Sequence, residues 1–280
     1  MFFYQLKNEL WKLFAKKRTY IGFLMLMLAQ LLIVGLLRYY PPAHRSLLSA
    51  VEQAGFIGQE YFSMLTVATV MVVVLAYTML PLYVALIGGD MVSKEAEDGT
   101  LRMILSRPVS RVRLLCLKWL AGVVFSIVLV LGLAAGALFF CSLFFPVGGG
   151  LFAQLPEQDL GVFNFNAGLV HFLLAHLLMV AKACAIMSLA FMFSCFNMKP
   201  AAAAILALSL ILIDRILMEI PYFHDLRHCF FDFHLNVWQF FFEPRIPWWQ
   251  IGESLGILFG ASLTFLIVGI AAFEVRDIKS

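Results

Sequence analysis

Long apolar stretches separated by short polar connections make up most of this chain. Six stretches are long and apolar enough to cross a bilayer as helices, at about residues 19–37, 63–88, 115–145, 168–196, 200–218 and 252–273. A bilayer core about 30 Å thick requires roughly 20 apolar residues in a helical span. The pattern therefore predicts an all-α membrane protein with six transmembrane helices, in which residues 1–280 form a single transmembrane domain.

The first 18 residues have a different, amphipathic pattern. Phe3, Leu6, Leu10, Leu13 and Phe14 recur at helical spacing, whereas the lysines fall mostly on the other face. Such a pattern is typical of a helix that lies in the interface of an anionic membrane, so we expect an interfacial helix over residues 1–18. The alternative is a disordered basic leader.

The composition supports a membrane protein and adds information through the placement of charge. Apolar residues make up 62% of the chain and charged residues only 13%, against about 25% charged residues in an average globular protein. The formal net charge of +3 is too small to indicate a nucleic-acid partner.

The lysines and arginines outside the apolar stretches are distributed unevenly between the two sides. Thirteen lie in the N-terminal segment, the second and fourth connections and the C-terminus: Lys7, Lys12, Lys16, Lys17, Arg18, Lys94, Arg102, Arg107, Arg111, Arg113, Lys199, Arg276 and Lys279. Four lie in the alternate connections: Arg38, Arg45, Arg227 and Arg245. Because positive charge is enriched on the cytoplasmic side, both termini are predicted to be cytoplasmic, in the cytoplasmic (inner) membrane.

The connection between the second and third stretches has an unusual pattern. A charged cluster at residues 94–98 leads to a turn at Gly99, and a short apolar run at residues 101–105 is stopped by Pro108. This predicts a short cytoplasmic helix between two spans, with apolar side chains suited to the groove of another protein.

The same residues resemble a known signature. Glu95-Ala-Glu-Asp-Gly99-Thr100-Leu101, followed by Leu105-Ser-Arg-Pro-Val-Ser-Arg111, is similar to the signature of type-two ABC transporter permeases. Within that family it looks most like the permeases of multicopper-enzyme maturation, including nitrous-oxide-reductase maturation, and residues 272–278 resemble the ending of many such subunits. The resemblance implies a coupling helix that docks onto an ATPase subunit. The residues that take this role by resemblance are Glu95, Glu97, Asp98, Gly99, Thr100, Leu101 and Arg102.

A nucleotide site is not expected in this chain. A P-loop needs a Gly-rich turn followed by Lys and Ser or Thr, and the sequence contains no Gly-Lys dipeptide. The chain is therefore predicted to be neither an enzyme nor a cofactor carrier, and ATP and Mg would be bound by a partner ATPase. The resemblance also implies a second permease subunit, identical or a sister, and export as the direction of transport.

Two other classes of function fit the sequence less well. A secondary transporter would often show internal repeats, and none is convincing here. A membrane-embedded enzyme or assembly factor would need a nucleophile or metal motif, and the chain has no His-Glu-x-x-His sequence.

Ionisable residues inside the spans mark a candidate polar pair. Lys182 and Asp214 each lie 16 residues from Met198, in the turn between the fourth and fifth stretches. At ~1.5 Å per residue they would share a depth of about 24 Å from that turn. We therefore expect Lys182 to pair with Asp214, with Arg215 joining them or reaching outward; the alternative is that the three line a translocation path.

The connection at residues 220–250 contains candidate metal ligands. His224 and His228 would share one face of an α-helix, and Asp232 or His234 could complete a site. The dense aromatic residues favour the alternative, an interfacial aromatic belt with no metal. These aromatic residues are Phe230, Phe231, Phe233, Trp238, Phe240, Phe241, Trp248 and Trp249.

Glycines at four-residue spacing indicate close helix packing. Gly132 and Gly136 form one such step, and Gly252, Gly256 and Gly260 form two. Steps of this kind let helix backbones approach closely, within one chain or between two. Pro81 is expected to kink the second span.

Overall fold

The computed structural model describes residues 2–55, 61–105, 110–153 and 160–275. The α-helices are α1 (Phe2–Ala15), α2 (Lys17–Tyr39), α3 (Pro41–Gln53), α5 (Met64–Tyr77), α6 (Met79–Glu97), α7 (Thr100–Leu105), α8 (Arg111–Phe144), α9 (Phe165–Cys195), α10 (Pro200–Met218), α11 (Phe231–Leu235) and α12 (Trp248–Val275). Two 3-10 helices, η1 (Pro221–Cys229) and η2 (Val237–Phe242), flank α11. Two short strands, β1 (Leu151–Ala153) and β2 (Gly161–Phe163), pair in antiparallel register.

Several of these helices are long and apolar enough to cross a membrane. Within the described residues, α2, α8, α9, α10 and α12 each qualify alone, and α5 with α6 qualifies as one bent span. The prediction of an all-α membrane protein is confirmed at this level. The chain is thus a multi-pass membrane protein whose β-structure, as far as it is described, is one small hairpin.

Helix α9 is the centre of the bundle. Two thirds (67%) of its apolar window is buried inside the protein, against 22% for α2, α10 and α12. Helices α6, α8, α10 and α12 all pack against it. The contact with α6 is very close, because a Cβ atom added at Gly88 would lie 2.6 Å from the carbonyl oxygen of Met187. Small residues permit this kind of backbone approach between membrane helices.

The second apolar stretch forms two helices rather than one. Helices α5 and α6 meet at Thr78 and are bent by 41°. Pro81 lies in the first turn of α6, and its nitrogen carries no hydrogen to donate to the carbonyl of Tyr77. The break is therefore at the place where the proline removes a helical hydrogen bond.

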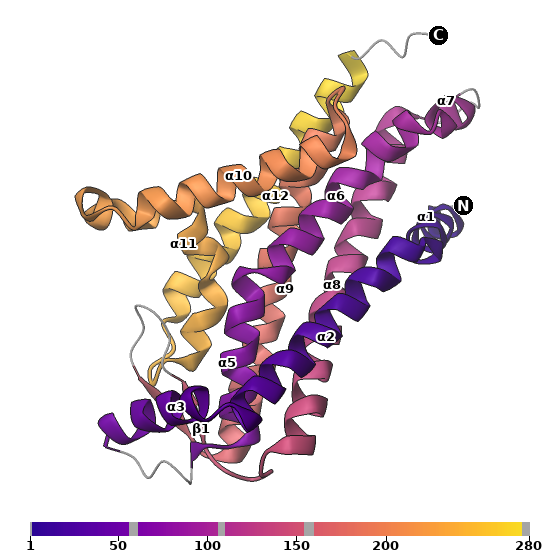
Figure 1. Ribbon diagram of the computed structural model, residues 1–280. Helices are drawn as coiled ribbons and strands as arrows, with labels where there is room; N and C mark the ends of the chain where they lie inside the picture. The colour runs from indigo at the N-terminus through magenta and orange to yellow at the C-terminus, as the bar shows by residue number, and fades with distance from the viewer. Residues whose placement is uncertain (1, 56–60, 106–109, 154–159, 276–280) are drawn as a thin grey trace.

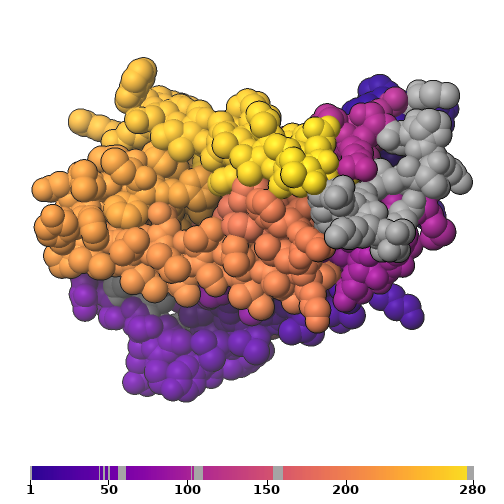
Figure 2. Space-filling model, turned by 90° about the horizontal axis from the view of Figure 1, so that it is seen from above, coloured from indigo at the N-terminus to yellow at the C-terminus, as the bar shows by residue number. Residues whose placement is uncertain are grey.

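The two ends of the bundle carry different structures (Figure 1). Helices α1 and α7 and the last turns of α12 lie at one end, which we call the α7 end; α3 and the β-hairpin lie at the other, the hairpin end. Seen from the α7 end, α10 and the elements after it occupy one side of the molecule (Figure 2).

Residues 221–242 fold back into the bundle. Helix α11 contacts α9, α10 and α12, and η2 contacts α9. Trp238 is fully buried, and the three phenylalanines at residues 240–242 are at most 5% exposed. The expected interfacial belt is therefore wrong for these side chains, which form part of the core, while Trp248 and Trp249 are largely exposed.

The two glycine patterns differ in their surroundings. A Cβ atom at Gly132 would lie 3.5 Å from the Phe23 ring, and one at Gly136 would lie 2.3 Å from Oε1 of Gln30, so both face α2. Around Gly252, Gly256 and Gly260, no described residue outside the local helix backbone lies within 4 Å of the added Cβ.

Candidate functional site

The corner between α6 and α7 is shaped by a glycine turn. Helix α6 ends at Glu97, and Gly99 follows with a φ of 71°, a left-handed conformation that glycine adopts without strain. The N–H of Asp98 donates to the carbonyl of Lys94 at 2.9 Å, and that of Gly99 donates to Ala96 at 3.2 Å. These bonds close α6 and turn the chain sharply into α7.

The exposed side of this corner is acidic. Lys94 bridges Glu97 at 2.9 Å and Asp98 at 3.1 Å, and the two carboxylates are 48% and 50% exposed. On α7, Leu101 is buried against the bundle, whereas Met103 is exposed. Parts of the signature and of the chain ending lie outside the described residues. These are the side chain of Arg102 and residues 106–109, in the second half of the signature, and residues 276–278 of the chain ending.

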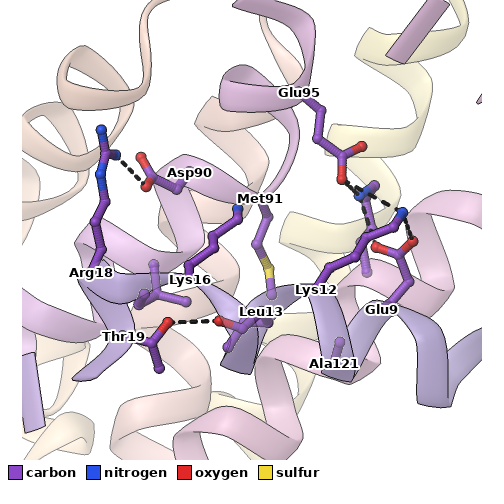
Figure 3. Close-up of a pocket in the computed structure, with 12 residues that line it drawn as sticks. Glu9, Lys12, Leu13, Lys16, Arg18, Thr19, Asp90, Met91, Glu95 and Ala121 are labelled. Atoms are coloured by element: carbon purple, nitrogen blue, oxygen red, sulfur yellow. Dashed lines mark hydrogen bonds and ion pairs between the residues drawn. The ribbon is translucent and has the colours of Figure 1, made fainter. Parts of the chain in front are cut away.

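Glu95 points away from this exposed edge and into the protein. Its Oε1 atom lies 2.6 Å from Nζ of Lys118 on α8, and Lys118 also donates to Oε2 of Glu9 on α1 at 2.9 Å. Lys12 completes the group, 2.6 Å from Glu9 and 4.0 Å from Glu95. Figure 3 shows Glu95 on α6 converging with Glu9 and Lys12, which both lie on α1. We call these four residues the Lys118 cluster.

Three of the four residues of the Lys118 cluster are shielded from solvent. The Lys118 side chain is 3% exposed, Glu9 12% and Glu95 15%, whereas Lys12 is 46% exposed. Burial by itself would raise the pKa of the Glu9 carboxyl, but Lys118 and Lys12 together more than offset that effect. The pKa of Glu9 is therefore held below its ordinary value of 4.5.

Sequence reasoning missed this cluster, although two signals were present. Glu9 is the only acidic residue among the first 18, and Lys118 is the only charged residue in the third apolar stretch. A single charged residue among residues of opposite charge or of no charge needs a partner. Glu9 and Lys118 could therefore have been predicted to pair.

A second set of contacts holds the junction of α1 and α2 to α6. Arg18 lies 2.9 Å from Asp90, and the Tyr83 hydroxyl donates to the carbonyl of Thr19. The Thr19 hydroxyl in turn donates to the carbonyl of Leu13 at 2.7 Å, which shapes the turn between the helices (Figure 3).

A cleft of about 770 Å³ opens beside the Lys118 cluster. Its walls come from α1, from the α6–α7 corner and from α8, and they include Lys12, Lys94, Asp98, Met103 and Leu117. The cleft therefore combines charged groups of both signs with apolar side chains at the α7 end.

Residues 6–224 match a family described as ABC-2 family transporter protein. The chain belongs to this family. No curated protein sequence matches it. Membership identifies the chain as a type-two ABC transporter permease, typically a non-enzymatic membrane component that works with ABC ATPase subunits.

The predicted pair in the interior of this ABC-2 permease is arranged differently from the expectation. Lys182 donates to Oδ1 of Asn236 at 2.9 Å, and the carboxylate of Asp214 accepts a bond of 2.6 Å from the N–H of Asp232. The structure shows no ion pair within 4.0 Å between Lys182 and Asp214, both of which it describes. The reason is that equal depth does not fix which way two helices face.

Tyr77 lies at the centre of this interior group. Lys182 Nζ is 4.7 Å from the centroid of its ring, Arg215 Cζ is 4.2 Å away, and the Gln239 side chain donates to its hydroxyl. Cations above an aromatic face are attracted by its π-electrons. Since Tyr77 is the last residue of α5, the group joins the break in the second span to α9, α10 and η2.

The candidate metal ligands of the permease do not form a set of three around one point. His224 and His228 lie on η1, a 3-10 helix with three residues per turn rather than the expected α-helix, although both line one pocket. Both nitrogens of His234 are occupied, by the Ser254 hydroxyl and the His228 carbonyl, each at 3.0 Å. Among the described residues, no group of three His, Cys, Asp or Glu residues is placed to hold a metal ion.

Proposed function

We propose that this chain is the permease subunit of an exporter, in which separate ATPase subunits hydrolyse ATP and drive a substrate outward across the cytoplasmic membrane. Family membership supports the permease role. The observation that carries the coupling is the α6–α7 corner, a short helix with an exposed acidic edge and an exposed Met103 beside a cleft of about 770 Å³.

In this proposal α7 is the coupling helix and the α7 end is cytoplasmic. The excess of lysine and arginine in the connections at this end supports the orientation. The amphipathic α1 lies at the same end, as an interfacial helix on the inner leaflet would. Two permease subunits, identical or sisters, would complete the transporter, and ATP and Mg would be bound by the ATPase subunits.

The docking surface we infer consists of Glu97, Asp98, Gly99, Thr100 and Met103. Glu97 and Asp98 offer carboxylates to basic groups of the ATPase, and Met103 offers an apolar side chain. Gly99 and Thr100 set the direction of α7, because the Thr100 hydroxyl donates to the carbonyl of Glu95 at 3.2 Å. Leu101 anchors α7 from beneath, and Arg102 is included from the signature alone.

The task of the transporter is proposed from the signature. The resemblance of residues 95–111 to permeases of multicopper-enzyme maturation favours an outward-directed step in the maturation of such an enzyme.

Co-purification tests the proposal. The chain is co-expressed with the ABC ATPase encoded nearest to it, and the amount of ATPase recovered with the detergent-extracted permease is measured. We expect the double variant Glu97→Lys with Asp98→Lys, or Met103→Glu alone, to lower recovery at least about tenfold, because each places a repulsive or charged group at the interface.

The matched control is Glu52→Lys, an exposed charge reversal on α3 at the hairpin end. It should leave recovery unchanged. Full recovery with the α7 variants would contradict docking at this corner, and no recovery with the unaltered chain would contradict the function itself.

A further inference from the structure

We propose that Lys118 is a positioning residue that fixes the N-terminal helix α1 to the α6–α7 corner. As a result, α1, the end of α6 and the start of α8 move as one unit when ATP binds. The inference rests on the proposed function and goes beyond it, because it makes α1 part of the coupling mechanism rather than a membrane anchor only.

The Lys118 ammonium group lies where α1, α6 and α8 meet. It is almost completely buried and bonds carboxylates from two other helices, Glu9 on α1 and Glu95 on α6. With Lys12, the cluster contains two cations and two anions. Removing one partner from a buried group of this kind leaves an uncompensated charge, so the helices are held strongly in one relative position.

The Glu95 carboxylate depends on Lys118 for its charge partner. Its Oε1 atom lies 2.6 Å from Lys118, while Lys12 is 4.0 Å away. Its Oε2 atom is buried and makes no hydrogen bond among the described residues. Lys118 is therefore the close partner of this carboxylate.

Glu95 also sets the start of α7. Its backbone carbonyl accepts the bond from Thr100, the first residue of α7. One residue thus contacts α7 through its main chain and α1 through Lys118. A displacement of α7 is passed on to Glu9 by three polar contacts in series.

The junction that follows α1 is also attached to α6. In the first turn of α2, Arg18 pairs with Asp90 and Thr19 accepts a bond from Tyr83, and the Thr19 hydroxyl donates to the carbonyl of Leu13 on α1. The C-terminal end of α1 is therefore tied to α6 through α2, in addition to the contact through Glu9. The exposed face of α1, with Phe3, Tyr4 and Trp11, would then transmit the movement to the membrane surface.

Distance measurements on the complete transporter test the inference. Spin labels are attached at Lys7→Cys on α1 and Arg113→Cys at the start of α8, both exposed positions outside the docking surface, in a background without the five natural cysteines. The complex with its ATPase is reconstituted in liposomes, and the distance is measured without nucleotide and after trapping with ATP and vanadate.

With the Lys118 cluster intact, we expect the same narrow distance distribution in both nucleotide states. Glu9→Gln and Lys118→Met should each give a broader distribution that shifts on trapping, and Lys118→Arg should restore the narrow one because it keeps the charge and both bonds. Glu52→Gln, which replaces an exposed carboxylate on α3, is the matched control. It should give the same distance distribution as the protein with the unaltered Lys118 cluster.

The outcomes separate the inference from the function. Glu9→Gln leaves the bond between Lys118 and Glu95 in place, so ATPase recovery should stay unchanged while the coupled movement of α1 is lost. A purely structural cluster would lower thermal stability in this variant and leave the nucleotide-dependent distance as it was, and that result would overturn the inference. A distance that shifts on trapping in the unaltered protein would overturn it as well.

Discussion

At the scale of single residues, Glu9 gives the Lys118 cluster a defined response to pH. A carboxyl whose pKa is lowered by folding stabilises the protein fully above its ordinary pKa, and that stabilisation is lost as the pH falls through the lower folded pKa. For Glu9 the ordinary value is 4.5 and the folded pKa lies below it. The attachment of α1 is therefore complete at neutral pH and weakens only in acid.

This predicts a pH-dependent difference between the unaltered chain and Glu9→Gln. At pH 7 we expect the Tm of the unaltered permease to be higher by about 2–4 °C, the shift that corresponds to about 1 kcal/mol in a protein of this size. The difference should stay constant down to about pH 5 and shrink below 4.5, measured by thermal unfolding in detergent. A difference that grows in acid would show that Glu9 is not held ionised by Lys118.

At the scale of elements, Lys182 links α9 to the folded-back segment at residues 221–242. It lies 17 residues after the start of α9 and 13 before its end, so about 26 Å and 20 Å from the two ends. Asn236 reaches it there. The segment between α10 and α12 therefore enters the bundle as far as the middle of α9.

Replacing Lys182 should release this segment. Lys182→Met leaves the side-chain oxygen of Asn236 without its donor and removes a cation close to buried Asp232. We therefore expect a loss of about 3 kcal/mol in the free energy of unfolding. Lys199→Met, at an exposed position, should change it by less than about 0.5 kcal/mol. Denaturation of the purified permease measures both values.

A charge exchange distinguishes this arrangement from the direct pair. If Lys182 and Asp214 were partners, combining Lys182→Asp with Asp214→Lys would restore the stability that each change removes. Since Lys182 bonds Asn236 and Asp214 bonds the main chain of Asp232, the double variant should be no more stable than the worse single one.

The same elements show how far the sequence determines the fold. Apolar length predicts the spans, because lipid imposes a nearly fixed requirement on every crossing helix. Pro81 predicts a kink in the second span because a missing N–H has a local effect. The direction in which Glu95 points depends on α1 and α8, which are distant in sequence, and no local pattern determines it.

The position of the segment at residues 221–242 could not be predicted from its sequence pattern. Its aromatic residues suit an interfacial belt as well as a buried core, since both environments favour large rings. The choice is made by Asn236, Asp232 and Gln239, whose partners lie on α9, α10 and α5. Single-sequence patterns cannot pair such distant polar groups.

At the scale of the whole molecule, the orientation in the membrane can be tested directly. Cysteines are introduced separately at Asp98 at the α7 end and at Glu52 at the hairpin end, and labelling by a membrane-impermeant maleimide is compared with that of the natural five-cysteine protein. In intact cells stripped of any outer barrier, we expect the maleimide to label Glu52→Cys. Asp98→Cys should react only after the membrane is opened.

The reverse pattern would place α7 on the outer side and rule out its contact with a cytoplasmic ATPase. Equal labelling of both positions in intact cells would show that one of the two ends does not lie where the charge distribution places it.

The break at Thr78 divides the second span into two helices whose relative angle could change. Helix α6 has 19 residues and is about 28 Å long, and α7 is attached to its far end. A rotation of about 10° at Thr78 would carry that end through about 5 Å, close to one helical turn, while α5 stays in place. The pivot is next to Tyr77, which two cations and Gln239 hold from three sides. If the α6–α7 corner docks an ATPase as proposed, a small angular change at Thr78 would move that corner by a large step and leave the hairpin end still.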